Sequence, residues 1–347
     1  MAANILTQAG FEPPEWARLA EGARPEQPAE RELGEPLRGW QREASKARDQ
    51  QEFLTLFTNL DQASRALLLS QAGPHGGRVL TTLPTAPEFR MDNAIFRVVM
   101  LRRLRMQLPH GPSRCRCHRA MDTYGDHRAA CPNAGVLKPR GIPLERAVAR
   151  ICREAGARVQ HNVLLADMNL DLPVADQRQI EVVANGLPLW HGAQLAVDAT
   201  LVCPVGRDGH PRPGGDVVPG LALQQAARTK REDTYPEFLA SERSRLVVFG
   251  LEVGGRWDQE ALDFLRGLAR AKARAQPDWL RASCVQGYLH RWTALAAVAA
   301  QSAFAQSLLE LPIGGGIRVD GDCPATHDVV ADARWTFPVY DSRLPVA

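Results

Sequence analysis

The sequence predicts an α/β fold, in which a small mixed sheet is flanked by helices and preceded by a helical segment and a cysteine-rich knuckle. Short β-branched runs alternate with segments whose apolar residues have helical spacing, which is typical of α/β layers. The chain has 347 residues, and 45% of them are hydrophobic, enough for a sizeable core. Three of the seven cysteines lie between Cys115 and Cys131, which places the knuckle.

Five parts are expected along the chain. Residues 1–50 are rich in Pro, Glu, Arg and Gly with little apolar periodicity, so a disordered or extended lead-in is predicted. A helical connector (51–110), a Cys/His module (111–140), an α/β core (141–255) and C-terminal helices with a tail (256–347) follow.

Helices are predicted first in the connector and at the start of the core. Apolar spacing predicts a helix over residues 51–71, ended by Gly73 and Pro74, and another over 92–107. Residues 144–155 form a third predicted helix, which Gly156 closes.

Strands are predicted at 159–168, 178–183, 194–202 and 245–251, from their β-branched and apolar runs. Asn185-Gly186 is a hairpin-turn dipeptide after the second of them. The remaining segments with helical spacing are 221–231, 258–275 and 286–309.

Charge and hydropathy limit the class of protein. The net charge of +3 is too small to indicate nucleic-acid binding by itself. The apolar stretch 293–313 is interrupted by Gln301, Gln306 and Glu310, so it predicts a buried or amphipathic helix and not a membrane span, and no membrane partner is expected. No leader peptide opens the chain, so we expect a nuclear or cytoplasmic protein that is not secreted. In a reducing compartment, clustered cysteines favour metal over disulfide.

The knuckle has the ligand chemistry of a structural zinc site. Cys115, Cys117, His127 and Cys131 form a Cys-x-Cys…His-x3-Cys set, and four protein ligands leave no open position. His118 is the alternative nitrogen ligand. His127 is preferred because Gly125-Asp126 supplies a turn before it and Asp126 could orient its ring. A chance cluster of thiols is the other interpretation.

Arginines surround this zinc knuckle. They would favour the thiolate forms and attract a nucleic-acid backbone. A solvated helix face is the alternative for those that precede it, between Arg97 and Arg105. The candidate contacts to nucleic acid from this group are Arg102, Arg103, Arg114, Arg116, Arg119 and Arg128.

A second constellation lies on the predicted strands. Glu181 and Asp198 are carboxylates inside otherwise apolar strands, and they converge if the hairpin pairs these strands. Such a pair accepts Mg²⁺, which would activate a water for phosphodiester hydrolysis, and a nearby lysine would neutralise the developing charge. In the alternative interpretation Glu181 points to solvent and Asp198 caps or pairs with an arginine.

The chain from about residue 92 to 238 resembles the C-terminal region of non-LTR retrotransposon polyproteins. That family places a Cys-Cys-His-Cys zinc motif after the reverse-transcriptase thumb, then a restriction-like nuclease of the PD-(D/E)xK class. The resemblance rests on the zinc set with Gly125-Asp126-His127, the helix from Glu145 to Gly156, and the segments Arg178-Gln-Ile-Glu181-Val-Val, Leu195-Ala-Val-Asp198-Ala-Thr-Leu-Val and Lys230…Tyr235.

The resemblance implies a restriction-endonuclease-like core, a thumb-like connector, and an endonuclease that nicks target DNA with Mg²⁺. Glu181 and Asp198 would hold the metal, Lys230 would be the migrated catalytic lysine, Tyr235 its accompanying tyrosine, and Arg178 would position phosphate. Target DNA and element RNA are the implied partners, and an upstream reverse-transcriptase region in a longer product is a further candidate.

The sequence departs from the family pattern at three points. Glu181 replaces the usual Asp, Thr200 stands where the wider class has its Lys, and the gap between the strands is slightly longer. No Tyr-x-Asp-Asp polymerase signature is present. A catalytically inactive nucleic-acid-binding remnant is therefore the alternative function, and an open reading frame without selected activity is a third.

Overall fold

The computed structural model describes residues 40–109, 114–173, 176–313, 321 and 323–334. The chain divides into two units, Met1–Asp61 and Gln62–Ala347. The predicted lead-in lies largely outside the described residues. Its last part, however, belongs to the helix α3 (Trp40–Asn59), so residues 40–50 are helical. These residues contain no Gly or Pro and many Arg, Gln, Glu and Ala, which are good helix formers.

The second unit is built on one mixed sheet. Its strands are β1 (Arg158–Leu164), β2 (Gln179–Asn185), β3 (Gln194–Val202) and β4 (Ser244–Glu252), in the order β1-β2-β3-β4. The first two pairings are antiparallel, and β3 runs parallel to β4. The predicted mixed sheet is confirmed, and each strand lies within a few residues of its predicted range.

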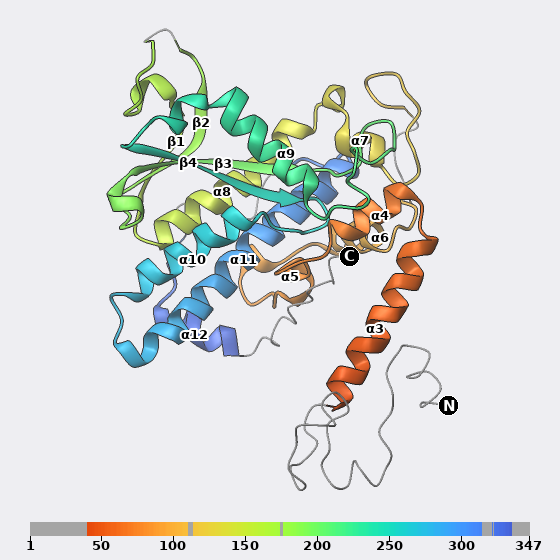
Figure 1. Ribbon diagram of the computed structural model, residues 1–347, viewed down its shortest axis with the longest axis horizontal. Coiled ribbons are helices and arrows are strands. Elements are labelled where there is room, and N and C mark those ends of the chain that lie inside the picture. The colour runs from red at the N-terminus through yellow and green to blue at the C-terminus, as the bar shows by residue number, and fades with distance from the viewer. Residues whose placement is uncertain (1–39, 110–113, 174–175, 314–320, 322, 335–347) are drawn as a thin grey trace, which may run out of the picture. The chain divides into compact units, whose positions relative to one another are not determined.

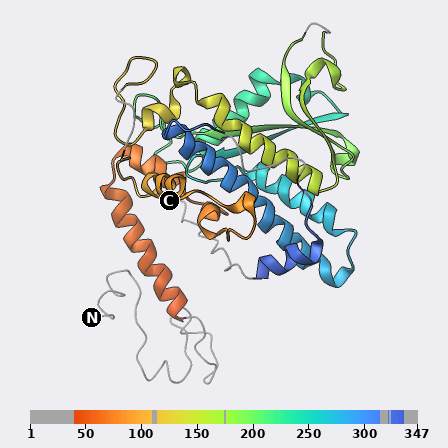
Figure 2. The same ribbon diagram turned by 180° about the vertical axis from the view of Figure 1, so that it is seen from behind.

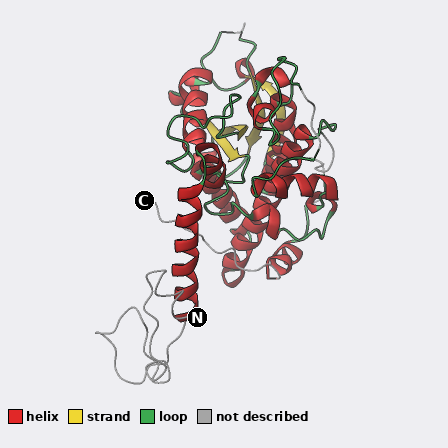
Figure 3. Ribbon diagram, turned by 90° about the vertical axis from the view of Figure 1, so that its right-hand side faces the viewer, coloured by secondary structure: helices red, strands yellow, loops and turns green. Residues whose placement is uncertain are grey.

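Helices cover both faces of this sheet (Figure 1). On one face α8 (Leu137–Glu154), α10 (Gln259–Ala273) and α11 (Asp278–Leu308) share a large core with β2, β3 and β4. On the other face α9 (Leu221–Thr229) and the short turns that follow it, Lys230–Thr234 and Pro236–Leu239, pack over β3 and β4. Figure 3 shows the strands enclosed between helices.

The long helix α11 organises the unit. It packs against α8, α10, α6 (Asn93–Arg103), the short helix α5 (Arg78–Thr81) and α12 (Thr326–Arg334). Figure 2 shows α11 and α8 side by side from behind. The C-terminal helices are thus part of the main core and do not form a separate region.

Several helix boundaries differ from the prediction, and α11 begins at Asp278 where residue 286 was expected. The single helix expected over 51–71 is instead two helices, since α3 ends at Asn59 and α4 (Gln62–Leu69) begins three residues later. The helix α6 ends at Arg103. The helix α8 begins at Leu137, since Pro143 inside it does not end it. Of the described helices, none combines the length and the apolar character that a bilayer crossing requires.

Candidate functional site: a Cys/His cluster and a carboxylate-lysine cluster

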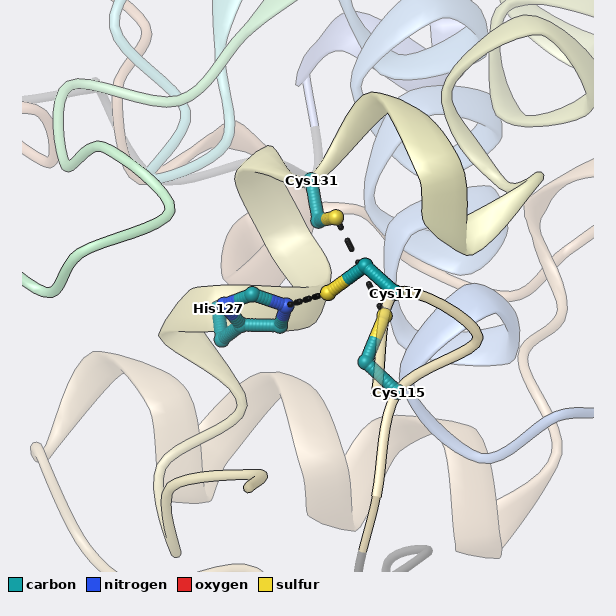
Figure 4. A group of neighbouring side chains, drawn as sticks. All are labelled: Cys115, Cys117, His127 and Cys131. Carbon is teal, nitrogen blue, oxygen red and sulfur yellow. Dashed lines mark hydrogen bonds between the residues drawn. The ribbon is translucent and has the colours of Figure 1, made fainter. Parts of the chain in front are cut away.

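The four predicted zinc ligands come together (Figure 4). Cys115 and Cys117 lie on a turn closed by a bridge between Arg114 and Ala120, and His127 and Cys131 lie within and at the end of α7 (Asp126–Ala130). The Sγ atoms of Cys115 and Cys131 are 3.9 Å apart, and Sγ of Cys117 is 3.1 Å from Nε2 of His127. All four ligand atoms lie within 4.8 Å of one another.

This geometry fits a tetrahedral zinc ion. Two thiolates on one zinc are about 3.8 Å apart, given zinc–sulfur bonds of about 2.3 Å. The backbone N–H of Arg119 lowers the pKa of Cys117 to about 6, which favours the thiolate that binds metal. Burial raises the pKa of Cys131, which a bound cation would counteract. The cluster can therefore hold a metal such as zinc.

The orientation of the histidine has a different cause from the one predicted. Nδ1 of His127 lies 2.6 Å from the carbonyl oxygen of Arg207, so Nδ1–H donates there and Nε2 is left to face the thiolates. Asp126 does not orient the ring, because its carboxylate pairs with Arg102 and Arg105 at 2.7 Å each. The alternative ligand His118 is exposed and is not part of the cluster.

A local carboxylate shapes this part of the chain. Asp122 accepts hydrogen bonds from the backbone N–H groups of Tyr124, Asp126 and His127, at 2.8–2.9 Å. The N–H groups of Asp126 and His127 are the first of α7 and have no partner within the helix. Asp122 therefore fixes the start of α7 and with it the position of His127.

The six arginines proposed to contact nucleic acid near the knuckle separate into two groups. Arg102 pairs with Asp126, Arg103 donates to the carbonyl of Gly254 at 2.6 Å, and Arg128 donates to the carbonyl of Ser307 and pairs with Glu310. These three side chains tie the knuckle and α6 to the core. Arg114, Arg116 and Arg119 are exposed beside the cysteines.

The second predicted constellation also assembles. β2 and β3 pair with Val182 opposite Val197, and the next step of this antiparallel register sets Glu181 opposite Asp198. Asp198 is fully buried, and its Oδ2 accepts a hydrogen bond from Nζ of Lys230 at 2.6 Å. Lys230 begins the π-helical turn after α9, and its ammonium thus reaches the carboxylates from outside the strands.

Thr200 and Tyr235 complete the surroundings of Asp198. The Thr200 hydroxyl donates to Oδ1 of Asp198 at 2.6 Å, so the residue at the family's lysine position contacts the same carboxylate. Tyr235 is buried, with the Lys230 ammonium 5.5 Å from its ring centre, and its hydroxyl donates to the carbonyl of Gln179 at 3.2 Å. Burial and the nearby charges of Glu181 and Asp198 raise the pKa of Tyr235, so it stays a neutral donor.

Arg178 lies at the edge of this cluster. Its guanidinium pairs with Asp176 and Glu237 and also donates to the carbonyl of Thr234 at 2.7 Å. Those contacts hold the turn before Tyr235 against the start of β2. A phosphate would have to share this arginine with two carboxylates.

Glu145 joins the cluster, which the sequence analysis did not anticipate as a site residue. It lies on α8, and burial followed by the negative charge of Asp198 raises its pKa. A glutamate beside buried Leu144 on an amphipathic helix is common, so the sequence carries no signal for it.

The carboxyl group of Glu181 has an unusual environment. Burial, and then the charge of Asp198, raise the pKa of Glu181 to about 7. Its Oε2 atom is buried without a hydrogen-bond partner among the described residues. The ladder between β1 and β2 also lacks a pair at Glu181, where the opposite Asn162 has φ of +50°. Among the described residues only the Cys/His cluster already has three or more ligand atoms at metal-binding spacing.

Comparison with protein-family models, with curated proteins and with solved structures finds no match for this chain. The two clusters and their geometry are therefore the basis of any functional assignment.

Proposed function

We propose that this chain is a retrotransposon-derived, restriction-like endonuclease region that nicks DNA by Mg²⁺-dependent hydrolysis of a phosphodiester. The observation that carries the proposal is the placing of Glu181 and Asp198 on neighbouring strands with the Lys230 ammonium on Asp198, while Glu145 of α8 interacts electrostatically with Asp198. The resemblance of the segments around these residues to non-LTR retrotransposon nucleases supports it.

The donor set suits a hard divalent cation. Carboxylate oxygens are the ligands that Mg²⁺ prefers, and the partnerless Oε2 of Glu181 is one donor that an ion would satisfy. Glu181, Asp198 and Glu145 would hold the ion. When bound, Mg²⁺ polarises the phosphate and lowers the pKa of an attacking water.

The other side chains have separate tasks in this proposal. Lys230 would release Asp198 and place its ammonium against the charge that builds on the phosphate oxygens. The Thr200 hydroxyl keeps one Asp198 oxygen oriented through its hydrogen bond. Tyr235 stays protonated, because burial raises its pKa. The proton on Glu181 has to leave before the ion binds, so activity should rise as the pH rises through about 7.

The zinc knuckle would serve as a nucleic-acid-binding module. Zinc would hold the turn that presents Arg114, Arg116 and Arg119, whose exposed side chains can neutralise phosphates of DNA or RNA. The proposed endonuclease would bind its target DNA in the nucleus or the cytoplasm.

Relaxation of supercoiled plasmid in Mg²⁺ tests the nuclease. The wild-type chain should form open circles, and Asp198→Asn, Glu181→Gln and Lys230→Met should each reduce the rate by about 100-fold or more. Asp263→Asn on the exposed side of α10 is the matched control and should nick at the wild-type rate. Nicking that survives Asp198→Asn would contradict the proposal.

A catalytically inactive nucleic-acid-binding module is the second candidate. It is favoured by the pairing of Lys230 with Asp198 and the high pKa of Glu181, because these let the cluster exist without a metal. A wild-type chain that shifts DNA on a gel but never nicks it in Mg²⁺ or Mn²⁺ would establish this alternative.

A further inference from the structure

A cavity of about 110 Å³ lies away from both clusters, between the segment that contains α5 and the helices α11 and α12. Its wall includes Arg78 and Thr82, Phe89, His290 and Arg291 of α11, and Asp332 of α12. Leu83, Ala294 and Val329 make much of the remaining wall apolar. The cavity thus combines a charged side chain with a largely hydrophobic surface.

Arg78 is the unusual residue of this cavity. Its side chain is 1% exposed, and its Nη2 donates to the carbonyl of His290 at 2.7 Å. The Nε and Nη1 atoms are buried without a hydrogen-bond partner in the described part of the chain. Burial lowers the pKa of Arg78 to about 10, yet the group stays charged at neutral pH.

Several other buried arginines of the protein have carboxylate partners, whereas Arg140 donates to the carbonyl oxygens of Ala129 and Leu201. Arg102 pairs with Asp126, and Arg150 and Arg291 share Glu88 and Glu154 at 2.8–3.2 Å. No such ion pair with Arg78 occurs in the described ranges. A buried charge without a counter-charge is costly, and a buried donor without an acceptor adds to that cost.

The charged and titratable neighbours of Arg78 do not balance its charge. Burial and the Arg78 charge lower the pKa of His290 to about 3, so that imidazole stays neutral. The Arg291 charge is balanced by Glu154 and Glu88, whereas Arg78 has no ion pair with a described residue. Asp332 lies on the exposed side of the wall and does not bond Arg78.

We propose that this cavity binds a small organic or inorganic anion, a carboxylate or a phosphate, with Arg78 as its charged anchor. A guanidinium whose Nε–H and Nη1–H groups lack acceptors offers donors to the oxygens of either group. Leu83, Phe89 and Ala294 offer apolar contact to a small hydrocarbon portion beside the anionic group. The site does not depend on the proposed nuclease function, because it shares no residue with either cluster.

Binding to the full-length chain tests the proposal. Phosphate and acetate are each titrated against chloride at matched ionic strength, with melting temperature and calorimetry as readouts. At least one of the two should stabilise the wild type saturably, and which one does so identifies the ligand chemistry. Arg78→Met should lose this response, and Arg78→Lys should weaken the affinity by about tenfold or more, since lysine lacks the planar fork.

Asp332→Asn is the matched control, because it removes a negative charge from the wall and should retain or strengthen anion binding. The N–Hε signal of Arg78, followed by NMR in ¹⁵N-arginine-labelled wild type, reports on the site without any substitution. A wild type that responds to neither anion beyond chloride, with an unmoved Arg78 signal, would overturn the proposal. An Arg78→Met chain that binds as the wild type does would overturn it as well.

Discussion

Asp198 and Glu181 face each other on neighbouring strands, but their environments differ. Both oxygens of Asp198 are hydrogen-bonded, one to the Lys230 ammonium and one to the Thr200 hydroxyl. Glu181 has no such cation at its Oε2, and it lies in the field of Asp198. Burial and the charge of Asp198 raise the pKa of Glu181 to about 7, so Glu181 keeps its proton up to about that pH.

Glu181 should make the stability of the protein depend on pH. The folded state holds its proton up to about pH 7, whereas the unfolded chain loses it near the ordinary value of 4.5. The unfolded state then binds fewer protons, so this contribution is fully present below 4.5 and is lost as the pH rises to 7.

Glu181→Gln should remove that dependence. Between about pH 4.5 and pH 8, the free energy of unfolding of the wild type should fall relative to Glu181→Gln by on the order of 2 kcal/mol. Urea unfolding of the two proteins at both pH values measures this difference, and other titrating groups such as Glu252 cancel. A difference that does not change with pH would show that Glu181 is ionised in the fold.

The two elements that carry the sites differ in what fixes them. β3 places Asp198 by period-2 alternation, two residues from Ala196 of the same face, whereas β2 departs from regular alternation beside Glu181, since Ile180 and Val183 share one core cluster. The knuckle has few apolar residues, so hydrogen bonds hold it in place. Asp122 accepts from the N–H groups at the start of α7, Arg128 donates to the carbonyl of Ser307 in α11, and His127 donates to the carbonyl of Arg207.

Loss of zinc should therefore be a local event. Cys117→Ser should reduce bound zinc from about one ion per chain to near zero and increase hydrogen exchange in residues 114–131. The strands should keep their protection, since Arg140 still bonds Ala129 and the sheet core is intact. Metal analysis and hydrogen exchange measure both effects, and Cys323→Ser, outside the cluster, is the control.

If Cys117→Ser kept its zinc, the assignment of ligands would be wrong. If its strands also lost protection, the metal would be needed for the whole fold. Gel-shift affinity for DNA should fall in this variant, because the turn carrying Arg114, Arg116 and Arg119 is no longer held.

Sequence reasoning succeeds where one residue type carries the chemistry. Cys115, Cys117, His127 and Cys131 are recognisable because clustered thiols are rare, and β3 is predicted to the residue because its apolar run is uninterrupted except for Asp198. It fails where the partner is a backbone group or a distant side chain. The carbonyl of Arg207 on His127 and the approach of Glu145 depend on packing that no local pattern encodes.

At the scale of the whole molecule, β3 links the two clusters. Asp198 lies in the middle of the strand, and the loop that follows Val202 brings the Arg207 carbonyl to the histidine of the knuckle. The helix α8 also contacts both clusters. Its Glu145 interacts with Asp198, and its Arg140 donates to the carbonyl of Ala129 in α7. A nucleic acid bound at the knuckle would thus lie on the part of the unit that also positions the acids.

The helix α11 holds the helices around both clusters in fixed positions. α11 is buried along most of its length and packs with α6, α8, α10 and α12. The sequence predicts this helix as a buried one, but α12 and the start of α11 were not predicted, because their apolar patterns are weak. The unit therefore provides a rigid frame, which a site that must hold carboxylates at fixed distances requires.

Divalent-ion binding to the zinc-loaded chain, measured by calorimetry with Mg²⁺ and Mn²⁺ at about pH 8, tests the central claim most directly. The wild type should bind a divalent ion saturably, and should do so more weakly at lower pH because Glu181 must lose its proton. Asp198→Asn should bind at least about tenfold more weakly, while Asp263→Asn binds normally. Equal binding by the wild type and Asp198→Asn, or no saturable binding by the wild type, would contradict a metal site at these carboxylates.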